Sequence, residues 1–242
     1  MKNRADKVWQ SAPLVRQYLD SVRGAIPLAA EQLEVMLRLI AARSQPVVNF
    51  LDLGCGDGML AGAILARYPN ARGVLLDFSR PMLDAAGEKL SRFAAQLELV
   101  TADLADPGWP DAVGSATPFE VVVSGYAIHH QPDERKRALY AEIYHLLTPG
   151  GLFVNIERVA SSTPWLEWVW DEYFIDTLHA RQLEPNRTQV AETYHRRPDR
   201  EANMLAPVET QCDWLRQIGY GDVDCYFKVF ELAVFGGRRP AS

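Results

Sequence analysis

Short apolar segments alternate with helical segments along most of the chain, and this alternation limits the possible folds more than any other feature. Apolar runs typical of buried strands, each bounded by turn residues, occur at residues 46–54, 73–77, 97–101, 119–124 and 152–157. Segments whose apolar residues have helical spacing precede these runs or lie between them, at residues 29–43, 59–67, 81–90 and 132–147. Strands that alternate with helices form βαβ units, so we expect an α/β fold with a parallel sheet.

The end of the chain follows a different pattern. Residues 208–218 have helical spacing, and residues 222–230 and 231–237 resemble two adjoining strands. We therefore expect a doubly wound, seven-stranded sheet that is mostly parallel and has an antiparallel last strand. This organisation predicts, within one structural domain, an N-terminal helical cap, a ligand-binding core, a lid or substrate insertion, and a C-terminal helix and strand hairpin that completes the core, at residues 1–45, 46–157, 158–207 and 208–242.

Charge and hydropathy argue against several classes of protein. The formal net charge is −6, whereas nucleic-acid binding normally requires a basic face, so nucleic acid is not an expected partner. No apolar run of about 18 residues occurs, so no membrane-spanning helix is expected. Residues 1–13 lack the apolar segment of a secretory signal, which favours a cytoplasmic location. The 3 cysteines have no metal-ligand spacing, so neither a disulfide scaffold nor a metal site is expected.

A glycine-rich segment, residues 51–58, follows the first predicted strand and opens a helix. Glycines at alternate positions allow a tight turn and close approach of a ligand to the backbone, and the free amides of the helix start attract polar groups. The spacing is GxGxG, with Met59 where a dinucleotide fingerprint needs glycine, so a nicotinamide-dependent dehydrogenase is not expected. Asp52 and Asp57 flank the glycines, and their charge favours a cationic or zwitterionic ligand.

Acidic residues also lie at the end of the second predicted strand and just after the third. Asp77 is in position to accept hydrogen bonds from ribose hydroxyls, and Asp103 to accept one from an exocyclic amine. Phe78 and Met82 offer apolar surface to a purine ring. Structural alternatives stay open, because Asp77 and Asp103 also suit turns and the two apolar residues also suit a core.

These segments together resemble the motifs of the class I S-adenosylmethionine-dependent methyltransferases. LDLGCGDG is similar to the first motif of that family, LLDFSRPML to the second, TADLAD to the third and FEVVVSGYAIHH to the fourth, while LLTPGGLFVNIE resembles the strand that follows. The motifs occur in order from about residue 48 to residue 157, and the combination is more specific than any single motif. The flanking segments resemble a bacterial branch of small-molecule methyltransferases, for which the resemblance implies a fold and S-adenosyl-L-methionine as cofactor but no acceptor.

The resemblance implies a role for each matching residue. Asp52 would hold the loop or the ammonium group of the cofactor, Asp77 the ribose and Arg23 the carboxylate, with Tyr18 as a second capping residue. The remaining residues implied to contact the cofactor are Gly54, Cys55, Gly56 and Gly58 at the methionine part, Phe78, Met82, Asp103 and Leu104 at adenine, and Ser124 near the methyl group. A solvated surface position is the alternative for Arg23.

The reaction would be an in-line displacement at an activated methyl group, so alignment and exclusion of water supply most of the acceleration. A base is needed only when the nucleophile must lose a proton. Candidate catalytic residues follow the fourth and fifth predicted strands, namely Tyr126, His129, His130 and Glu157. The two histidines also suit a purely structural turn, and Glu157 an ion pair with Arg158.

The insertion at residues 158–207 is expected to select the substrate, a small molecule. Trp165, Trp168 and Tyr173 would either form a pocket wall or attach a cap helix to the core, and the basic cluster at residues 195–200 either binds an anion or is solvated. Alternative functions are a cofactor-modifying enzyme that resembles carboxy-S-adenosylmethionine synthase, and a non-catalytic protein that binds S-adenosylmethionine. A monomer or a homodimer is expected.

Overall fold

One sheet of seven strands organises the chain in the computed structural model, which describes residues 4–43, 45–181 and 186–241. The strand order is β3-β2-β1-β4-β5-β7-β6, in which β1 to β5 pair in parallel and β7 is antiparallel to both of its neighbours. This confirms the predicted sheet. The strands are β1 (Asn49–Leu53), β2 (Arg72–Asp77), β3 (Leu97–Thr101), β4 (Phe119–Gly125), β5 (Leu147–Arg158), β6 (Gly221–Val229) and β7 (Leu232–Arg238).

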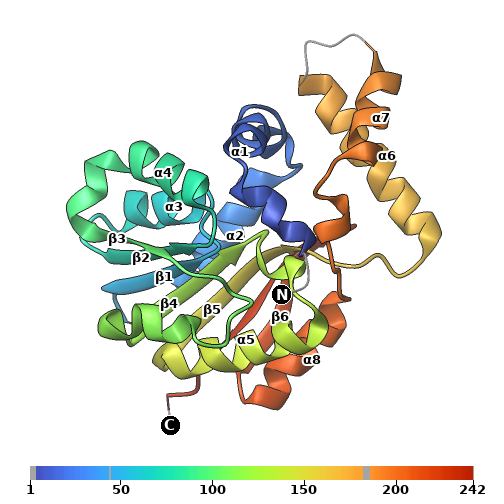
Figure 1. Cartoon of the computed structure of the whole chain (residues 1–242). Coiled ribbons are helices and arrows are strands. Elements are labelled where there is room, and N and C mark those ends of the chain that lie inside the picture. The colour runs from blue at the N-terminus through green and yellow to red at the C-terminus, as the bar shows by residue number, and fades with distance from the viewer. Residues whose placement is uncertain (1–3, 44, 182–185, 242) are drawn as a thin grey trace.

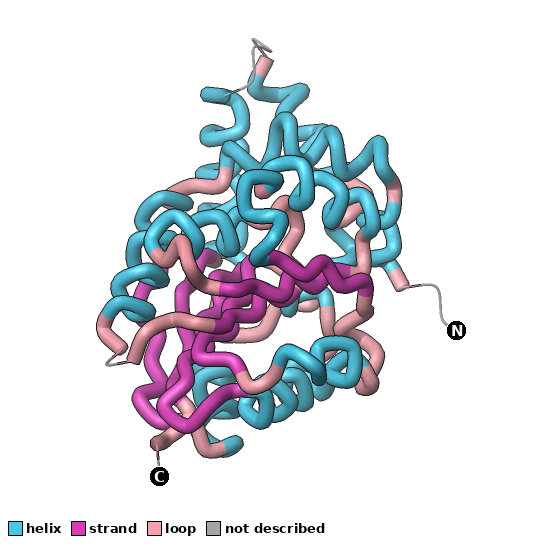
Figure 2. Tube along the Cα trace, turned by 90° about the vertical axis from the view of Figure 1, so that its left-hand side faces the viewer, coloured by secondary structure: helices cyan, strands magenta, loops and turns pink. Residues whose placement is uncertain are grey.

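Helices cover both faces of the sheet (Figures 1 and 2). On one face lie α2 (Ala29–Ala41), α3 (Met59–Arg67) and α4 (Arg80–Lys89), and on the other α5 (Asp133–Leu146) and α8 (Val208–Ile218). Successive residues of a strand point to opposite faces, so in β1 Phe50 packs on the first group of helices, whereas Leu51 and Leu53 pack on the second. Both faces are apolar, which explains why the strands read as continuous apolar runs.

Two helical segments lie outside these layers, beside the carboxyl ends of the parallel strands (Figure 1). The N-terminal segment contains η1 (Ala5–Gln10), α1 (Ala12–Gln17), a π-helical turn η2 (Tyr18–Val22) and η3 (Arg23–Ala25), and the insertion contains α6 (Pro164–Arg181), α7 (Arg187–Arg196) and η7 (Arg200–Ala202). The insertion packs on the N-terminal segment through a small apolar cluster of its own, in which Ala25 meets Ile175 and Tyr194.

Two segments differ from the expected pattern. The expected loop after β3 contains a 3-10 helix, η5 (Trp109–Ala116), because the buried indole of Trp109 anchors it and its Nε1 donates to Glu142. The fifth strand begins five residues early, at Leu147, because Gly150 donates to Arg239 and extends the pairing with the C-terminal segment. Two further 3-10 turns are η4 (Ser91–Gln96) and η6 (Ile128–His130). Within the described ranges, no helix is long and apolar enough to cross a membrane.

Candidate functional site

Two cavities meet above the carboxyl ends of β1, β2 and β4, which is where open parallel sheets bind ligands. The inner cavity lies against the sheet and is lined by Asp6, Trp9, Tyr18, Arg23, Gly54, Cys55, Gly56, Asp57, Asp77, Phe78, Ser79, Met82, Ala102, Asp103, Leu104, Gly125, Tyr126, Ala127, His130 and Gln131. The outer cavity has a volume of about 690 Å³ and lies between the N-terminal segment and the insertion. Most of the residues that the sequence predicted for the cofactor therefore line one space.

The glycine loop forms the floor of the inner cavity. Gly54, Gly56 and Gly58 have φ of 62°, 54° and 73°, values that favour glycine. A Cβ on Gly54 would lie 2.2 Å from the Cβ of Ala127, whereas a Cβ on Gly56 would meet no atom nearer than the Met82 sulfur at 3.9 Å. Gly54 thus keeps the loop against the turn after β4, and Gly56 leaves the backbone open to a ligand.

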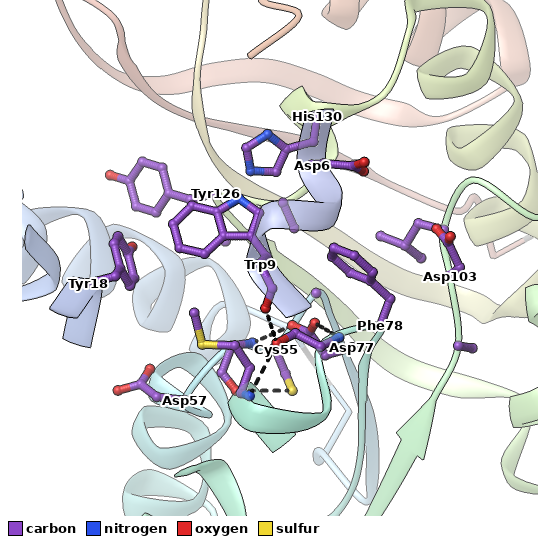
Figure 3. Close-up of a pocket in the computed structure, with 18 of the residues that line it drawn as sticks. Asp6, Trp9, Tyr18, Cys55, Asp57, Asp77, Phe78, Asp103, Tyr126 and His130 are labelled. Atoms are coloured by element: carbon purple, nitrogen blue, oxygen red, sulfur yellow. Dashed lines mark hydrogen bonds between the residues drawn. The ribbon is translucent and has the colours of Figure 1, made fainter. Parts of the chain in front are cut away.

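Asp77 faces the inner cavity from the end of β2. One carboxylate oxygen accepts from the backbone N–H of Gly56 at 2.9 Å, and the other accepts from that of Ser79 at 2.8 Å. Burial raises the pKa of Asp77 to about 6, against the lowering effect of these backbone donors. The side chain therefore connects the glycine loop to the start of α4 (Figure 3).

Asp103 is the predicted partner of an amine, and the N-terminal segment already contacts it. The guanidinium of Arg4 donates to one carboxylate oxygen at 2.7 Å, and the backbone N–H of Ala105 donates to the other at 2.9 Å. Arg4 also pairs with Asp6, and the hydroxyl of Ser79 donates to the carbonyl of Trp9. These contacts close the N-terminal segment over the inner cavity.

Four residues line both cavities, and we call them the aromatic collar: Trp9, Tyr18, Tyr126 and His130. The ring centroids of Trp9 and Tyr18 are 5.0 Å apart at an angle of 80°, and those of Trp9 and His130 are 6.2 Å apart. Figure 3 shows Trp9 between the other collar residues and the glycine loop. Any group that passes between the cavities passes this collar.

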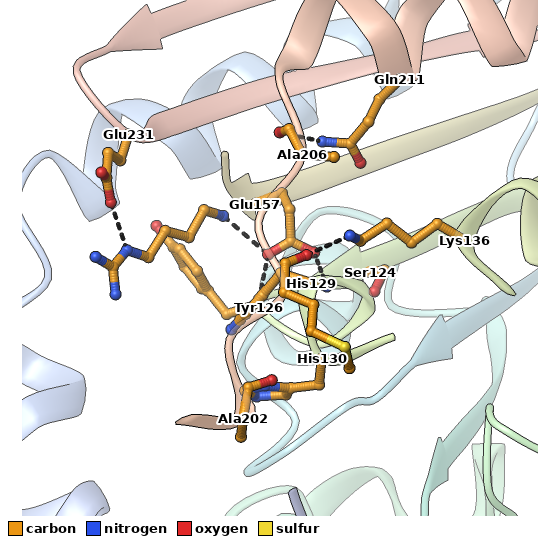
Figure 4. A network of polar contacts seen from close by, with 12 residues as sticks. Ser124, Tyr126, His129, His130, Lys136, Glu157, Ala202, Ala206, Gln211 and Glu231 are labelled. Atoms are coloured by element: carbon orange, nitrogen blue, oxygen red, sulfur yellow. Dashed lines mark hydrogen bonds and ion pairs between the residues drawn. The ribbon is translucent and has the colours of Figure 1, made fainter. Parts of the chain in front are cut away.

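His129 and His130 differ in their surroundings (Figure 4). His129 is buried, with its Nδ1 2.6 Å from an oxygen of Glu157, which also accepts from the backbone N–H of Arg158. The Nδ1 of His130 lies 3.1 Å from the carbonyl oxygen of Ala202, which only accepts, so this nitrogen is the donor. Burial lowers the pKa of His130 well below 6.5, and its ring is neutral at pH 7.

The tautomer of His130 follows from these contacts. With the proton on Nδ1, the Nε2 atom carries a free lone pair, and no hydrogen bond within the described part of the chain reaches it. The ring lines both cavities, and its centroid is 4.0 Å from that of His129. His130 thus presents a hydrogen-bond acceptor at the junction of the two cavities.

Four other predicted site residues line neither cavity. Asp52 is buried, with one oxygen accepting from the backbone N–H of Ala61 at 3.1 Å, and burial raises its pKa to about 7. Gly58 packs on α4, and the hydroxyl of Ser124 donates to the carbonyl of Leu53. Glu157 is in contact with the ring of His129. Its sequence neighbour Arg158 forms an ion pair with Glu231 rather than with Glu157. These residues support the site from below.

The insertion forms the far wall of the outer cavity. Trp170, Phe174 and Tyr194 line it, and the rings of Trp170 and Phe174 are stacked at 5.3 Å. Trp165 and Trp168 are 67% and 59% exposed and do not line it, while Tyr173 packs on Trp170.

Sequence reasoning missed Asp6 and Trp9. They belong to no periodic pattern, and they reach the site only because the N-terminal segment folds back onto α4, which is distant in the sequence. Arg23 is not the solvated arginine of the alternative interpretation, because its side chain is 15% exposed, lines the inner cavity and lies 3.7 Å from Asp57.

Comparisons with known proteins identify the type of domain and the fold. Residues 50–151 match a family model described as a methyltransferase domain. The chain is 27% identical to the carboxy-S-adenosyl-L-methionine synthase of Shewanella amazonensis, over 88% of this chain and 85% of that protein. It is 32% identical to the demethylmenaquinone methyltransferase of Leptospira interrogans, over 52% of this chain and 49% of that protein.

Solved structures show the same fold. An O-methyltransferase family protein from Burkholderia thailandensis superposes with a TM-score of 0.61 at 17% identity, over 95% of this chain and 58% of that one. Human N-acetylserotonin methyltransferase, solved in complex with S-adenosylmethionine, superposes with a TM-score of 0.58 at 16% identity, over 99% of this chain and 59% of that one. The chain thus spans less than two thirds of the length of these solved proteins.

Proposed function

We propose that this chain, which contains a methyltransferase domain with the class I fold, transfers a methyl group from S-adenosylmethionine to an oxygen, nitrogen or carbon atom of a small molecule. The observation that carries the proposal is the junction of two cavities at the aromatic collar. One cavity has a glycine floor and a buried carboxylate, and the other has aromatic walls. This arrangement suits a methyl donor on one side and an acceptor on the other.

The chemistry of the inner cavity fits S-adenosylmethionine. Asp77 is suited to the ribose hydroxyls, Phe78 and Met82 to the adenine ring, and Arg23 to the carboxylate. Asp103 and Leu104 are at the predicted adenine end. The collar contains no cationic side chain, since His130 is neutral, and aromatic faces attract a positive charge such as a sulfonium. The bound donor supplies a methyl group that is already activated for displacement.

His130 is the residue that we propose as the base. Its free Nε2 lies at the junction of the cavities, and its Nδ1–H is directed by the carbonyl of Ala202. Glu157 and His129 are positioning residues, because they form a buried pair against which the His130 ring packs. Tyr126 lies in the collar with its hydroxyl committed to Gln32, and burial raises its pKa, so it is a wall rather than a base.

The N-terminal segment and the insertion, residues 1–45 and 158–207, are proposed as cap and lid around these two cavities. Arg4 and Trp9 tie the cap to the core, and Ala25 joins it to the lid. Segments that cover the cavities in this way would reduce the access of water to a methyl transfer.

A second candidate is the formation of a carboxylated cofactor, as the name of the Shewanella relative states for that protein. The match over nearly the whole chain favours it. That product carries a carboxylate on the transferred carbon, which calls for a cationic partner beside the sulfonium. None of the four collar side chains is cationic, and Arg23, which lines the inner cavity beside Tyr18, is the proposed partner of the amino-acid carboxylate, so this arrangement favours methyl transfer. Mass spectrometry of cofactor released from the purified protein separates the two, because only the second candidate yields a cofactor that has gained a carboxyl group.

Titration calorimetry with S-adenosylhomocysteine tests the cofactor site. We expect micromolar binding, lost in Asp77→Ala and retained in Asp84→Ala, which removes an exposed acid from the following helix. Folding of each variant is checked by circular dichroism. Absence of binding to the folded wild-type protein would contradict the proposed function.

A further inference from the structure

We infer that the acceptor is an uncharged aromatic compound with a hydroxyl group, and that it binds in the outer cavity with this hydroxyl at His130. The inference rests on the proposed methyl transfer and adds the chemical class of the substrate. Three independent features of the outer cavity carry it: the character of its walls, the pairing of its arginines, and the free nitrogen at its junction with the inner cavity.

The walls of the outer cavity are aromatic on opposite sides. Trp170 and Phe174 stack on the lid side at an interplanar angle of 26°, and the ring of Tyr194 lies 5.6 Å from that of Phe174. Trp9 and Tyr18 of the collar form the facing side. A cavity of about 690 Å³ is in the range that encloses a drug-sized molecule. Flat, rigid aromatic rings are the ligands that such walls pack against best.

Three arginines line the outer cavity, and each is already paired with a carboxylate. Arg158 donates to Glu231 at 2.7 Å, and Glu231 is only 1% exposed. The guanidinium of Arg197 lies 3.4 Å from Asp199 and 4.0 Å above the ring of Tyr194.

The third arginine, Arg196, is 81% exposed and lies 3.9 Å from Glu192. The acidic partners Glu192 and Asp199 line the cavity too, and Glu231, the partner of Arg158, is buried behind its wall, so each of the three positive charges has a carboxylate beside it. A carboxylate that entered would lose its water without gaining an unpaired cation, which disfavours an anionic substrate.

The junction defines the reacting group. His130 offers the Nε2 lone pair, which accepts a proton from an O–H group. As the acceptor oxygen bonds to the methyl carbon, the carbon–sulfur bond breaks, the sulfur keeps the electron pair, and the hydroxyl proton moves to Nε2. An amine or a thiolate that reacts without a base would leave this oriented nitrogen unused.

Two matched probes test the inference by calorimetry: 2-naphthol, and 6-hydroxy-2-naphthoate, which differs only by a carboxylate. Protein saturated with S-adenosylhomocysteine is titrated with each at about pH 7.5, where the naphthoate is ionised and the naphthol hydroxyl is not. We expect 2-naphthol to bind at least about tenfold more tightly, which corresponds to about 1.4 kcal/mol. Equal affinity, a preference for the naphthoate, or no binding of either probe would overturn the inference.

Saturation with S-adenosylhomocysteine is measured first, so the two proposals fail separately. If the protein binds S-adenosylhomocysteine but does not prefer 2-naphthol, only the proposed class of acceptor is refuted. If the protein does not bind S-adenosylhomocysteine, the proposed methyl transfer itself is refuted.

Variants of the walls localise the effect. Asp199→Asn releases Arg197 and is expected to raise the affinity for 6-hydroxy-2-naphthoate while leaving that for 2-naphthol unchanged. Phe174→Ala is expected to weaken 2-naphthol binding, and Trp168→Ala, which removes a 59% exposed ring from the same helix, is the matched control. Equal losses in Phe174→Ala and Trp168→Ala would show that the probe does not occupy the outer cavity.

Discussion

Substitution of Gly54 by alanine tests whether the glycine loop is held by the turn that follows β4. Two costs are expected. At a φ of 62° the alanine adopts a left-handed conformation, which costs about 1–2 kcal/mol. Its Cβ would also lie 2.2 Å from the Cβ of Ala127, far inside the contact distance, and forced overpacking of this kind costs about 1–3 kcal/mol. The free energy of unfolding should therefore fall by about 2–5 kcal/mol.

Two other glycines separate these costs. Gly150 has a φ of 78° and open space around it, so Gly150→Ala should show the conformational cost alone, about 1–2 kcal/mol. Gly114 has neither a positive φ nor a neighbour within 4 Å, so Gly114→Ala should leave stability within about 0.5 kcal/mol of wild type or raise it slightly. Urea unfolding followed by tryptophan fluorescence measures all three.

A double-mutant cycle then isolates the contact. Ala127→Gly removes the opposing Cβ, so the pair Gly54→Ala and Ala127→Gly should recover about 1–3 kcal/mol relative to the sum of the single variants. Binding of S-adenosylhomocysteine should weaken in Gly54→Ala and recover in the double variant. A coupling energy near zero would refute the reasoning, since it would mean that the loop does not rest on Ala127.

Three further predictions concern charge and protonation. His130→Gln should lower kcat/KM about 10²–10⁴-fold and abolish the acid limb of the pH–rate profile, and it should change S-adenosylhomocysteine affinity much less than kcat/KM. His145→Gln, at an exposed position, should change neither kcat/KM nor the pH–rate profile. Burial raises the pKa of Asp52 to about 7, so the free energy of unfolding falls as the pH rises from about 4 to about 7 and the buried carboxyl loses its proton. Asp52→Asn should therefore be more stable than wild type at about pH 8 and lose that advantage at about pH 4, as measured by urea unfolding. Arg4→Ala frees Asp103 and should speed proteolysis of the N-terminal segment, whereas Arg38→Ala should not.

The parts of the fold that were predictable depend on local signals. The inner parallel strands β1, β2 and β4 are largely buried on both faces and so read as apolar runs, whereas the edge strand β3 is partly exposed. The glycines of the loop follow from the backbone conformations that they adopt. The position of Asp77 in the inner cavity was predictable because this residue ends a strand, and the carboxyl ends of parallel strands share one edge.

The remaining features depend on contacts between distant segments. Trp9 reaches the site through the bond between its carbonyl and Ser79, and no pattern around Trp9 indicates this. The sequence also left open whether the basic residues of the insertion bind an anion. The pairing of Arg158 with Glu231 joins residues 73 positions apart, so no local pattern indicates it.

The low pKa of His130 bears on how strong a base the proposed reaction requires. Burial and the neighbouring His129 both disfavour the charged ring, so the free Nε2 is available throughout the neutral range but takes a proton weakly. A phenol, with a pKa near 10, does not lose its proton to such a base in the ground state. Its acidity rises as its oxygen bonds to the methyl carbon, and only then does transfer to Nε2 become favourable. A weak, neutral base at an uncharged collar therefore restricts proton transfer to the transition state, where it accelerates the reaction.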